Sequence, residues 1–365
     1  MTLVAAVALD GYPVIFGDLL VSATGRRSVA RDIPSEDSLT ADNAGSQWPI
    51  PDLDQKVVLV SNHCVVAWTG SVASARAMVG ELRAMASKAA LSISSIETYL
   101  AQLGPGNDEF SLVGWIRDGE VFHQFWYRAD IAKSAMFGQI SAAGSGASEF
   151  VDVASQIAAG PVDARGDAPL GLERAVAAML SATSLLLRAE LSGKSDPLQH
   201  FGDGYEIATF IGDRFAKLGD IGFVSWKADI ADGQVTLSGP EFILKQDYAG
   251  EYLLLHALRM RPGGAAGAPS VIEEAKRVIS PLVDTIDVER AAGIAWPGME
   301  ATFTCHVVFV RSPKGFDVVN QIEYSESRMP GSIRFSLDDG RTPFGVSQQF
   351  CEALMKSIHA GFAGV

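Results

Sequence analysis

The stretch TLVAAVALDGYPVIFGD, residues 2–18, decides the fold of this chain. It opens with a continuous apolar run, turns at Asp10-Gly11 and resumes as a second apolar run before Gly17-Asp18. An Asp-Gly pair between two apolar runs is a preferred two-residue hairpin turn. The sequence therefore predicts an opening β-hairpin whose second strand leads into Gly17-Asp18.

A second hairpin and two helices follow after a polar segment. Residues 56–60 (KVVLV) and 64–68 (CVVAW) are apolar and flank Ser-Asn-His, which predicts two paired strands. Apolar residues then recur at helical spacing over 71–89, and residues 92–103 repeat that character. We expect these two helices to pack on the preceding sheet.

Runs of strands and runs of helices follow one another through the rest of the first two thirds of the chain. Strands are expected at 110–116, 121–127, 140–143, 204–212 and 221–230, and helices at 147–159 and 172–191. Segregated runs of this kind indicate an α+β fold rather than a doubly wound parallel sheet. We therefore expect two sheets between two helix layers, a four-layer αββα sandwich.

The pattern changes beyond about residue 240. The expected elements there are helices over 269–291 and 346–362 and strands near 302–310 and 316–324. They form a second, smaller α/β unit. We divide the chain into a domain of residues 1–238 and a C-terminal extension of residues 239–365.

The composition excludes several classes of partner. A formal net charge of -14 and a pI near 4.9 argue against a nucleic-acid or anionic-membrane surface, because phosphate binding needs clustered Lys and Arg. No stretch approaches the ~18 uninterrupted apolar residues of a transmembrane helix. Asp10 and Asp18 interrupt the apolar start, which argues against a signal peptide. We expect a soluble protein with proteins or small molecules as partners.

Cysteine and histidine usage points the same way. Three cysteines are too few, and lie too far apart, for a disulfide framework, so a reducing cytoplasm is the simplest location. The six histidines show no HExxH spacing and no CxxC occurs. We therefore expect neither a metal site nor a cofactor.

Five positions, in this order, carry a resemblance to a known family. Thr2 follows the initiator methionine, Asp18 comes after the first hairpin, Lys56 opens the second, Gly70 follows it, and Ser145 lies in AAGSGAS. Over about residues 2–230 the chain resembles proteasome β-type subunits and their bacterial relatives, which are N-terminal-nucleophile (Ntn) hydrolases.

The resemblance implies a threonine-type hydrolase of amide bonds, above all of peptide bonds. The family's nucleophile corresponds to Thr2 once the initiator methionine is removed. Its catalytic Asp and Lys fall on Asp18 and Lys56, its backbone oxyanion donor on Gly70, and its glycine-flanked serine on Ser145. Family members assemble into rings, so the resemblance also implies a homo-oligomer, with a regulatory ATPase as a further partner.

A free α-amine explains how threonine could react without a histidine. Its reference pKa of ~8 lies near working pH, so the Thr2 amine could accept the hydroxyl proton and return it to the leaving amine. The Lys56 ammonium would disfavour protonation of that amine, while Asp18 would hold Lys56 charged and oriented. The Gly70 N–H would meet the developing oxyanion, a donor type worth ~3 kcal/mol in the transition state.

Two features depart from the family pattern. The stretch before Lys56 is longer than usual, so its assignment requires residues 26–54, a polar segment rich in Pro, Asp and Ser, to be an inserted loop or lid. Arg31 is the alternative basic residue. The family's additional Asp has two candidates here, Asp196 and Asp203.

Each position also has an ordinary explanation when taken alone. Asp18 could be a turn residue, Lys56 a strand-edge charge, and Ser145 the cap of a tight strand-to-helix turn. The alternative function is therefore a catalytically inactive scaffold or binding protein. A small-molecule amidase of the wider Ntn class is a further alternative, because one nucleophile serves many amides.

Overall fold

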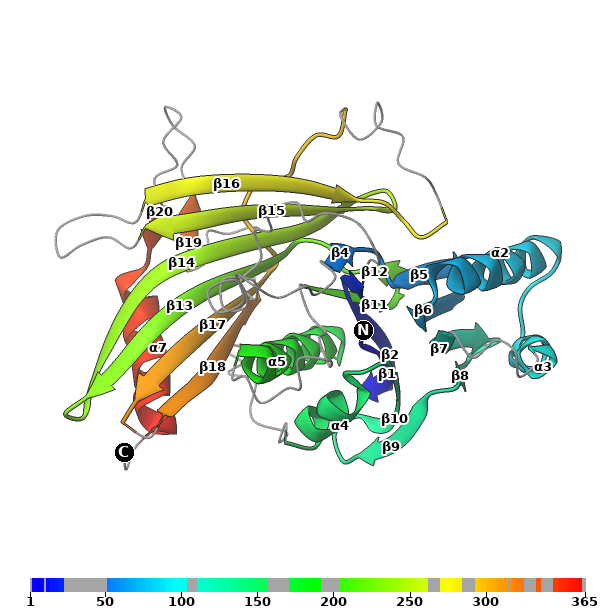
Figure 1. The fold of residues 1–365 in the computed structure, drawn as a ribbon, viewed down its shortest axis with the longest axis horizontal. Helices are drawn as coiled ribbons and strands as arrows, with labels where there is room; N and C mark the ends of the chain where they lie inside the picture. Colours follow the sequence, from blue (N-terminus) through cyan, green and yellow to red (C-terminus); the bar gives the residue numbers. More distant parts are fainter. Residues whose placement is uncertain are drawn as a thin grey trace. The chain divides into compact units, whose positions relative to one another are not determined.

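The computed structural model of the chain forms two compact units (Figure 1). It describes residues 2–9, 11–22, 51–103, 110–156, 171–191, 204–261, 270–283, 293–313, 315–324, 333–335 and 344–362. The described residues up to Leu218, together with 279–283, belong to the first unit. The second unit takes 219–278 and the described residues from 293 onward.

The first unit contains a six-stranded sheet built around the opening hairpin. The strand order is β12-β11-β2-β1-β10-β9, and the paired neighbours are antiparallel. The strands are β1 (Val4–Leu9), β2 (Tyr12–Asp18), β9 (Asp130–Ser134), β10 (Gly138–Ala143), β11 (Tyr205–Ile211) and β12 (Arg214–Lys217). The predicted hairpin is confirmed, because β1 pairs with β2 and Gly11 lies in the turn with a φ of 84°.

A four-stranded sheet of order β5-β6-β7-β8 also belongs to the first unit. Its strands are β5 (Val57–Ser61), β6 (Cys64–Gly70), β7 (Phe110–Asp118) and β8 (Val121–Tyr127). Helices α2 (Val72–Lys88) and α3 (Ile93–Gln102) pack on it through a core that includes Trp68 and Leu82. Ser71 and Ser92 cap these helices by accepting a backbone N–H from three residues on. The predicted hairpins and helices of this region are confirmed.

The two sheets contact each other through apolar side chains such as Ile15 and Trp115. Helix α4 (Ala147–Gln156) contacts β9 and β10, and α5 (Gly171–Leu191) contacts β2. Phe16, next to Ile15 and therefore on the opposite face of β2, meets Phe150 of α4 with ring centroids 4.7 Å apart. A short ribbon of β3 (Leu20–Ser22) and β4 (Pro51–Leu53) lies between β2 and β5 in the sequence.

The second unit is a long six-stranded sheet with one helix packed on it. The order is β16-β15-β14-β13-β17-β18, with β13 and β17 parallel. The strands are β13 (Ile221–Ala231), β14 (Gln234–Ala249), β15 (Tyr252–Arg261), β16 (Ser270–Ile279), β17 (Phe303–Ser312) and β18 (Gly315–Tyr324). Helix α7 (Gln348–Gly361) covers a core that includes Trp226 and Val308, and β19 (Ile333–Phe335) pairs with β20 (Phe344–Val346).

The expected fold class, a four-layer αββα sandwich with a smaller α/β extension, is wrong for this chain. Strands make up 52% of the structure and helices 27%, and there are three large sheets instead of two. The third sheet, in the second unit, has six strands of up to 16 residues. An apolar or alternating run identifies a strand but not the sheet it joins, so the sequence pattern did not reveal this sheet.

The helix expected over residues 269–291 is also wrong for its first part, because Ser270–Ile279 forms strand β16, and residues 269 and 284–291 lie outside the described residues. Its sequence SVIEEAKRVI contains good helix formers, but β16 lies at the edge of its sheet, where charged side chains remain in water. The expected boundary at 238/239 falls inside β14, whereas the units divide between Leu218 and Gly219. The expected strands near 302–310 and 316–324 and the final helix are present as β17, β18 and α7.

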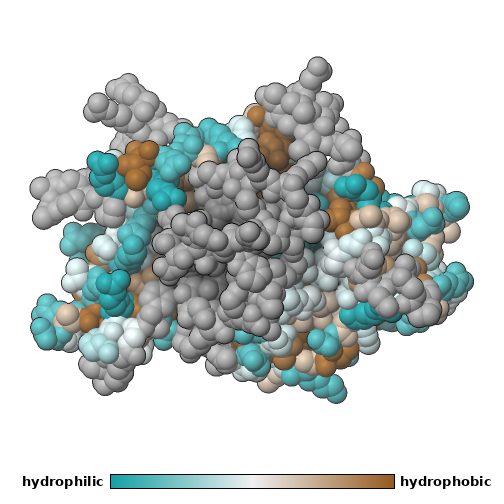
Figure 2. Space-filling model, in the orientation of Figure 1, coloured by the Kyte–Doolittle hydropathy of each residue, from teal (hydrophilic) through white to brown (hydrophobic). Residues whose placement is uncertain are grey.

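Hydrophilic and hydrophobic residues are interspersed over the coloured part of the surface in Figure 2. Exposed large apolar side chains occur on several strands, for example Trp126 on β8 and Ile272 on β16. Scattered apolar residues of this kind are normal for protein surfaces. Within the described ranges, no helix is long and apolar enough to cross a membrane.

Candidate active site

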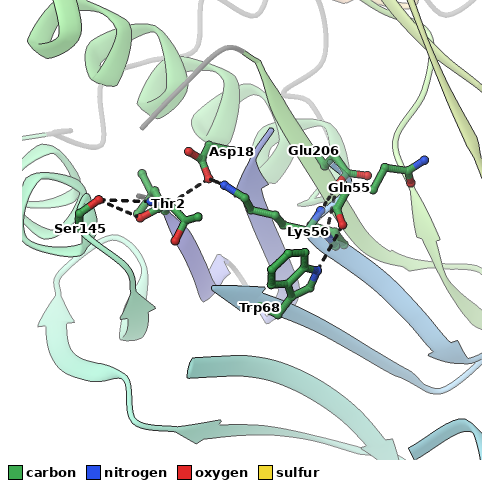
Figure 3. A network of polar contacts seen from close by, with 9 residues as sticks. Thr2, Asp18, Gln55, Lys56, Trp68, Ser145 and Glu206 are labelled. Carbon is green, nitrogen blue, oxygen red and sulfur yellow. Dashed lines mark hydrogen bonds and ion pairs between the residues drawn. The ribbon is translucent and has the colours of Figure 1, made fainter. Parts of the chain in front are cut away.

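Four of the five predicted site residues lie around the first strand, as Figure 3 shows. Strand β1 lies between β2 and β10, and Val4 is opposite Gly17 on one side and Ala143 on the other. Thr2, Asp18 and Ser145 lie one or two residues from these paired positions. The register therefore brings all three to one end of the sheet.

Thr2 is enclosed by the turn that follows β10. It is 5% exposed, its backbone N–H donates to Ser145 Oγ at 3.2 Å, and its carbonyl accepts from the Gly146 N–H at 3.3 Å. Gly144 has a φ of 96°, and a Cβ there would lie 2.8 Å from Thr2 Oγ1 and even closer to the Thr2 carbonyl. Glycine is therefore required at 144 by both its backbone conformation and the close approach of Thr2.

Lys56 and Asp18 form an ion pair with no exposed surface. Lys56 Nζ donates to Asp18 Oδ1, and both side chains are 0% exposed. The same carboxylate oxygen accepts from the Leu3 N–H at 2.8 Å, while the Asp18 N–H donates to the Leu3 carbonyl at 2.9 Å. Asp18 thus connects the lysine ammonium to the residue next to Thr2.

Burial lowers the pKa of Lys56 below its usual value of 10.5, although the charges of Asp18, Asp54 and Glu206 act in the opposite direction. Desolvation penalises the ammonium more than its neighbours stabilise it. The group therefore releases its proton more readily than a lysine on the surface. Lys56 can therefore act beside Thr2 as a charged group whose protonation state depends on the residues around it.

Three further residues, which the sequence did not single out, form a hydrogen-bonded network beside Lys56. They are Glu206, Lys217 and Gln55. Glu206 Oε2 accepts from the N–H groups of Lys56 at 2.7 Å and Val57 at 3.1 Å. Lys217 Nζ donates to Glu206 Oε1 at 2.7 Å and to the Gln55 side chain, whose Nε2 donates to the Ile279 carbonyl at 2.7 Å. Glu206 is the one charged residue of strand β11 (YEIATFI), which by itself does not show whether the side chain is buried.

Asp54 is a second acid near Lys56 that the sequence did not single out. Burial raises its pKa from 3.8 to about 6, with a contribution from the charge of Glu206. The backbone N–H of Gln55 and the cations Arg76 and Lys56 oppose this shift. Asp54 therefore changes charge close to neutral pH, beside the candidate site.

The other predicted positions stand as follows. Gly70 ends β6 opposite Phe110, is exposed and has a φ of 94°, so its role as an oxyanion donor stays a prediction. Lys56 pairs with Asp18, as its predicted role requires. Arg31, Asp196 and Asp203 lie outside the described residues.

Metal ligands and thiols do not contribute to this arrangement in the part of the chain that the structure describes. No group of three or more His, Cys, Asp or Glu side chains is placed there to hold a metal ion. Cys64 and Cys305 are buried, and burial raises the pKa of both thiols, to about 12 for Cys305, which disfavours the reactive thiolate.

No protein-family model and no curated protein matches the chain significantly.

Proposed function

We propose that the chain is a threonine-type N-terminal-nucleophile hydrolase that cleaves amide bonds, with peptides as its expected substrates. The observation that supports this most directly is the convergence of the opening hairpin, which carries Thr2 and Asp18, with two distant segments that carry Lys56 and Ser145. The proposal requires cleavage of the bond between Met1 and Thr2, because only then does Thr2 carry a free α-amine.

The reaction uses the two functional groups of Thr2. Its hydroxyl oxygen attacks the substrate carbonyl while the α-amine takes the hydroxyl proton. The C–N bond then breaks, the leaving amine receives that proton, and an ester to Thr2 remains. Water, activated by the same amine, hydrolyses the ester and restores the hydroxyl.

Lys56 and Ser145 act on the amine and the hydroxyl of Thr2. A positive charge on Lys56 lowers the pKa of the amine and favours ionisation of the hydroxyl, and Asp18 holds that charge in place. Ser145 Oγ lies 3.2 Å from the Thr2 nitrogen, so it can accept a hydrogen bond from the amine and orient the lone pair of the nitrogen. The ring assembly, the regulatory ATPase and the cytoplasmic location implied by the family resemblance stay predictions.

The experiment begins with the intact mass of the purified protein, which determines whether Thr2 is the terminal residue. A fluorescent β-lactone, which acylates activated hydroxyl groups, is then applied, and the labelled residue is located by peptide mass spectrometry. We expect labelling at Thr2 that survives in Thr2→Ser and is lost in Thr2→Ala. Thr98→Ala, at an exposed hydroxyl on α3, is the matched control and should label normally.

A free Thr2 terminus without labelling, or equal labelling of Thr2→Ala, would contradict the proposal. A protein that keeps Met1 after every preparation would instead favour the alternative of a catalytically inactive scaffold or binding protein. If Thr2 is labelled but peptide libraries are not cleaved, small amides become the substrates to screen.

A further inference from the structure

Glu206 is a fully buried carboxylate that contacts the backbone of Lys56, one of the candidate site residues. It is 0% exposed, Oε2 accepts from two consecutive backbone N–H groups at Lys56 and Val57, and Oε1 accepts from Lys217. Figure 3 shows it on the opposite side of Lys56 from Asp18. Lys56 is thus held at its backbone by one acid and at its ammonium by another.

Hydrogen bonding alone does not require a charged group at this position. A neutral amide or hydroxyl could accept the same backbone N–H groups, whereas burying a carboxylate with its lysine carries a desolvation penalty of several kcal/mol per ion. Lys217 is 9% exposed, so water does little to relieve that penalty. The charge of Glu206 therefore calls for an explanation beyond the pairing of strands.

We infer that Glu206 is a positioning residue for the active site: it fixes the backbone of Lys56, so that the ammonium meets Asp18 beside Thr2, and its charge helps to keep that ammonium protonated. This inference rests on the proposed function. Strand β5 is at the edge of its sheet, so without Glu206 its first N–H groups lose their acceptor and the start of the strand is free to shift.

The charged groups around Lys56 determine the direction of the electrostatic effect. Asp18 on β2, Glu206 on β11 and Asp54 just before Lys56 stabilise the ammonium. Lys217 on β12 offsets Glu206, and Arg76 on α2 acts on Asp54. Removing the charge of Glu206 should lower the pKa of Lys56 further, and removing Lys217 should raise it.

The test separates the hydrogen bonds from the charge. Glu206→Ala removes both, whereas Glu206→Gln keeps an oxygen that can accept the backbone N–H groups. We expect Glu206→Ala to lower the rate of β-lactone labelling at Thr2 by about 100-fold, as for a misplaced catalytic group, and Glu206→Gln to restore part of that rate. Glu120→Ala and Glu120→Gln, at an exposed ion pair with Arg117, are matched controls that should label at the rate of the unmodified protein.

The titration of Lys56 provides a second readout that does not depend on activity. It is followed through the ¹³Cε chemical shift of the lysine, assigned with Lys56→Met. We expect Glu206→Gln to move the midpoint to lower pH and Lys217→Met to move it to higher pH. A purely structural role would instead lower stability in both variants without opposite shifts.

These outcomes distinguish the inference from the proposed function. If Thr2 is labelled and Glu206→Ala reacts at the unmodified rate with an unchanged Lys56 titration, the inference is wrong and the proposed function stands. If a free Thr2 is never labelled, the proposed function is wrong, and the Lys56 midpoint in the two charge variants still tests whether Glu206 controls that lysine.

Discussion

Each unit of the molecule contains a buried lysine paired with an aspartate, and only one of the pairs lies beside a candidate nucleophile. In the first unit Lys56 pairs with Asp18, and in the second Lys245 pairs with Asp220. The lysines are equally enclosed, at 0% and 1% exposure. The surroundings of the two pairs differ.

Both partners of the pair in the second unit form additional hydrogen bonds to neighbouring residues of the fold. Lys245 also donates to the Glu300 carbonyl at 2.6 Å, and Asp220 accepts from both the N–H and the hydroxyl of Thr302. Burial would raise the pKa of Asp220, but the hydrogen bonds from Lys245 and Thr302 outweigh it and lower the pKa. This pair therefore joins the chain before β13 to the chain before β17.

The pair in the first unit is more deeply buried. Asp18 is 0% exposed, whereas Asp220 is 30% exposed, and burial lowers the pKa of Lys56 despite three acidic neighbours. A buried Lys–Asp pair alone does not identify an active site. The distinguishing features are the complete burial of both partners and the position of the pair next to Thr2.

The largest expected effect comes from replacing the two lysines in parallel. Lys56→Met should reduce β-lactone labelling of Thr2 by about 100- to 1000-fold, the cost of losing one preorganised electrostatic partner. It also removes the cation that pairs with the buried Asp18 carboxylate, which should cost about 3–5 kcal/mol of stability. Lys245→Met should leave labelling within about twofold, because its pair lies in the other unit.

Labelling rates and denaturant unfolding of both variants measure this contrast. Equal loss of labelling in Lys245→Met and Lys56→Met would show that the variants act through general destabilisation. The functional distinction between the two pairs would then be lost.

Two glycines with positive φ provide a narrower comparison. Gly144 (φ 96°) touches Thr2, whereas Gly250 (φ 64°), between β14 and β15, has no atom within 4 Å of an added Cβ. Alanine at either position carries about 1–2 kcal/mol of backbone strain. Only Gly144→Ala must also displace Thr2, so its labelling should fall by about 100-fold while that of Gly250→Ala stays unchanged.

Thermal unfolding and labelling of the two alanine variants check this prediction. A similar decrease in melting temperature with normal labelling in both would mean that the approach of Gly144 to Thr2 has no functional consequence.

Some of the site follows directly from strand patterns that the sequence displays. An apolar pair of runs around Asp10-Gly11 predicts a hairpin, and a hairpin brings Thr2 and Asp18 to the same end of the sheet. Lys56 and Ser145 come from distant segments, so the hairpin alone could not place them. Their assignment depended on the family resemblance.

Other features could not be predicted because tertiary context decides them. Glu206 in a strand has the pattern of a solvent-facing charge, and its burial requires Lys217 on the paired strand β12 and the backbone of Lys56. The composition of residues 270–279 suits a helix, and only the neighbouring strand β15 makes the segment a strand. Sequence periodicity alone indicates neither the partners of Glu206 nor the pairing of β16 with β15.

A smaller effect should appear in the pH dependence of the first unit. Because burial raises the pKa of Asp54 from 3.8 to about 6, the folded state holds a proton that the unfolded state has lost between these values. Stability therefore falls as pH rises from about 4 to 6, and the penalty remains above that range. Asp54→Asn should be more stable than the unmodified protein at pH 7.5, by about 2 kcal/mol after allowance for partial exposure.

Denaturant unfolding at pH 7.5 and at pH 4 measures this difference. The advantage of Asp54→Asn should become much smaller at pH 4, where the carboxyl is protonated in the folded state and only partly ionised in the unfolded state. An advantage of the same size at both values would assign it to packing instead of charge.

The smallest expected effect is a pH dependence of opposite sign in the second unit. Burial lowers the pKa of His306, although Glu323 opposes this, and the Trp226 Nε1–H donates to His306 Nδ1 at 3.2 Å. Protonation of the ring would remove that acceptor. Since the folded pKa lies below 6.5, the unfolded state binds the proton first, and stability is lost as pH falls below 6.5.

His306→Gln keeps an acceptor for Trp226 without the titration, so its stability relative to the unmodified protein should improve between pH 7.5 and pH 5.5. Hydrogen exchange of peptides from β13 and β17 measures this in the second unit, with His359→Gln at an exposed position on α7 as control. Identical relative protection at both pH values would mean that His306 is not the source of acid sensitivity.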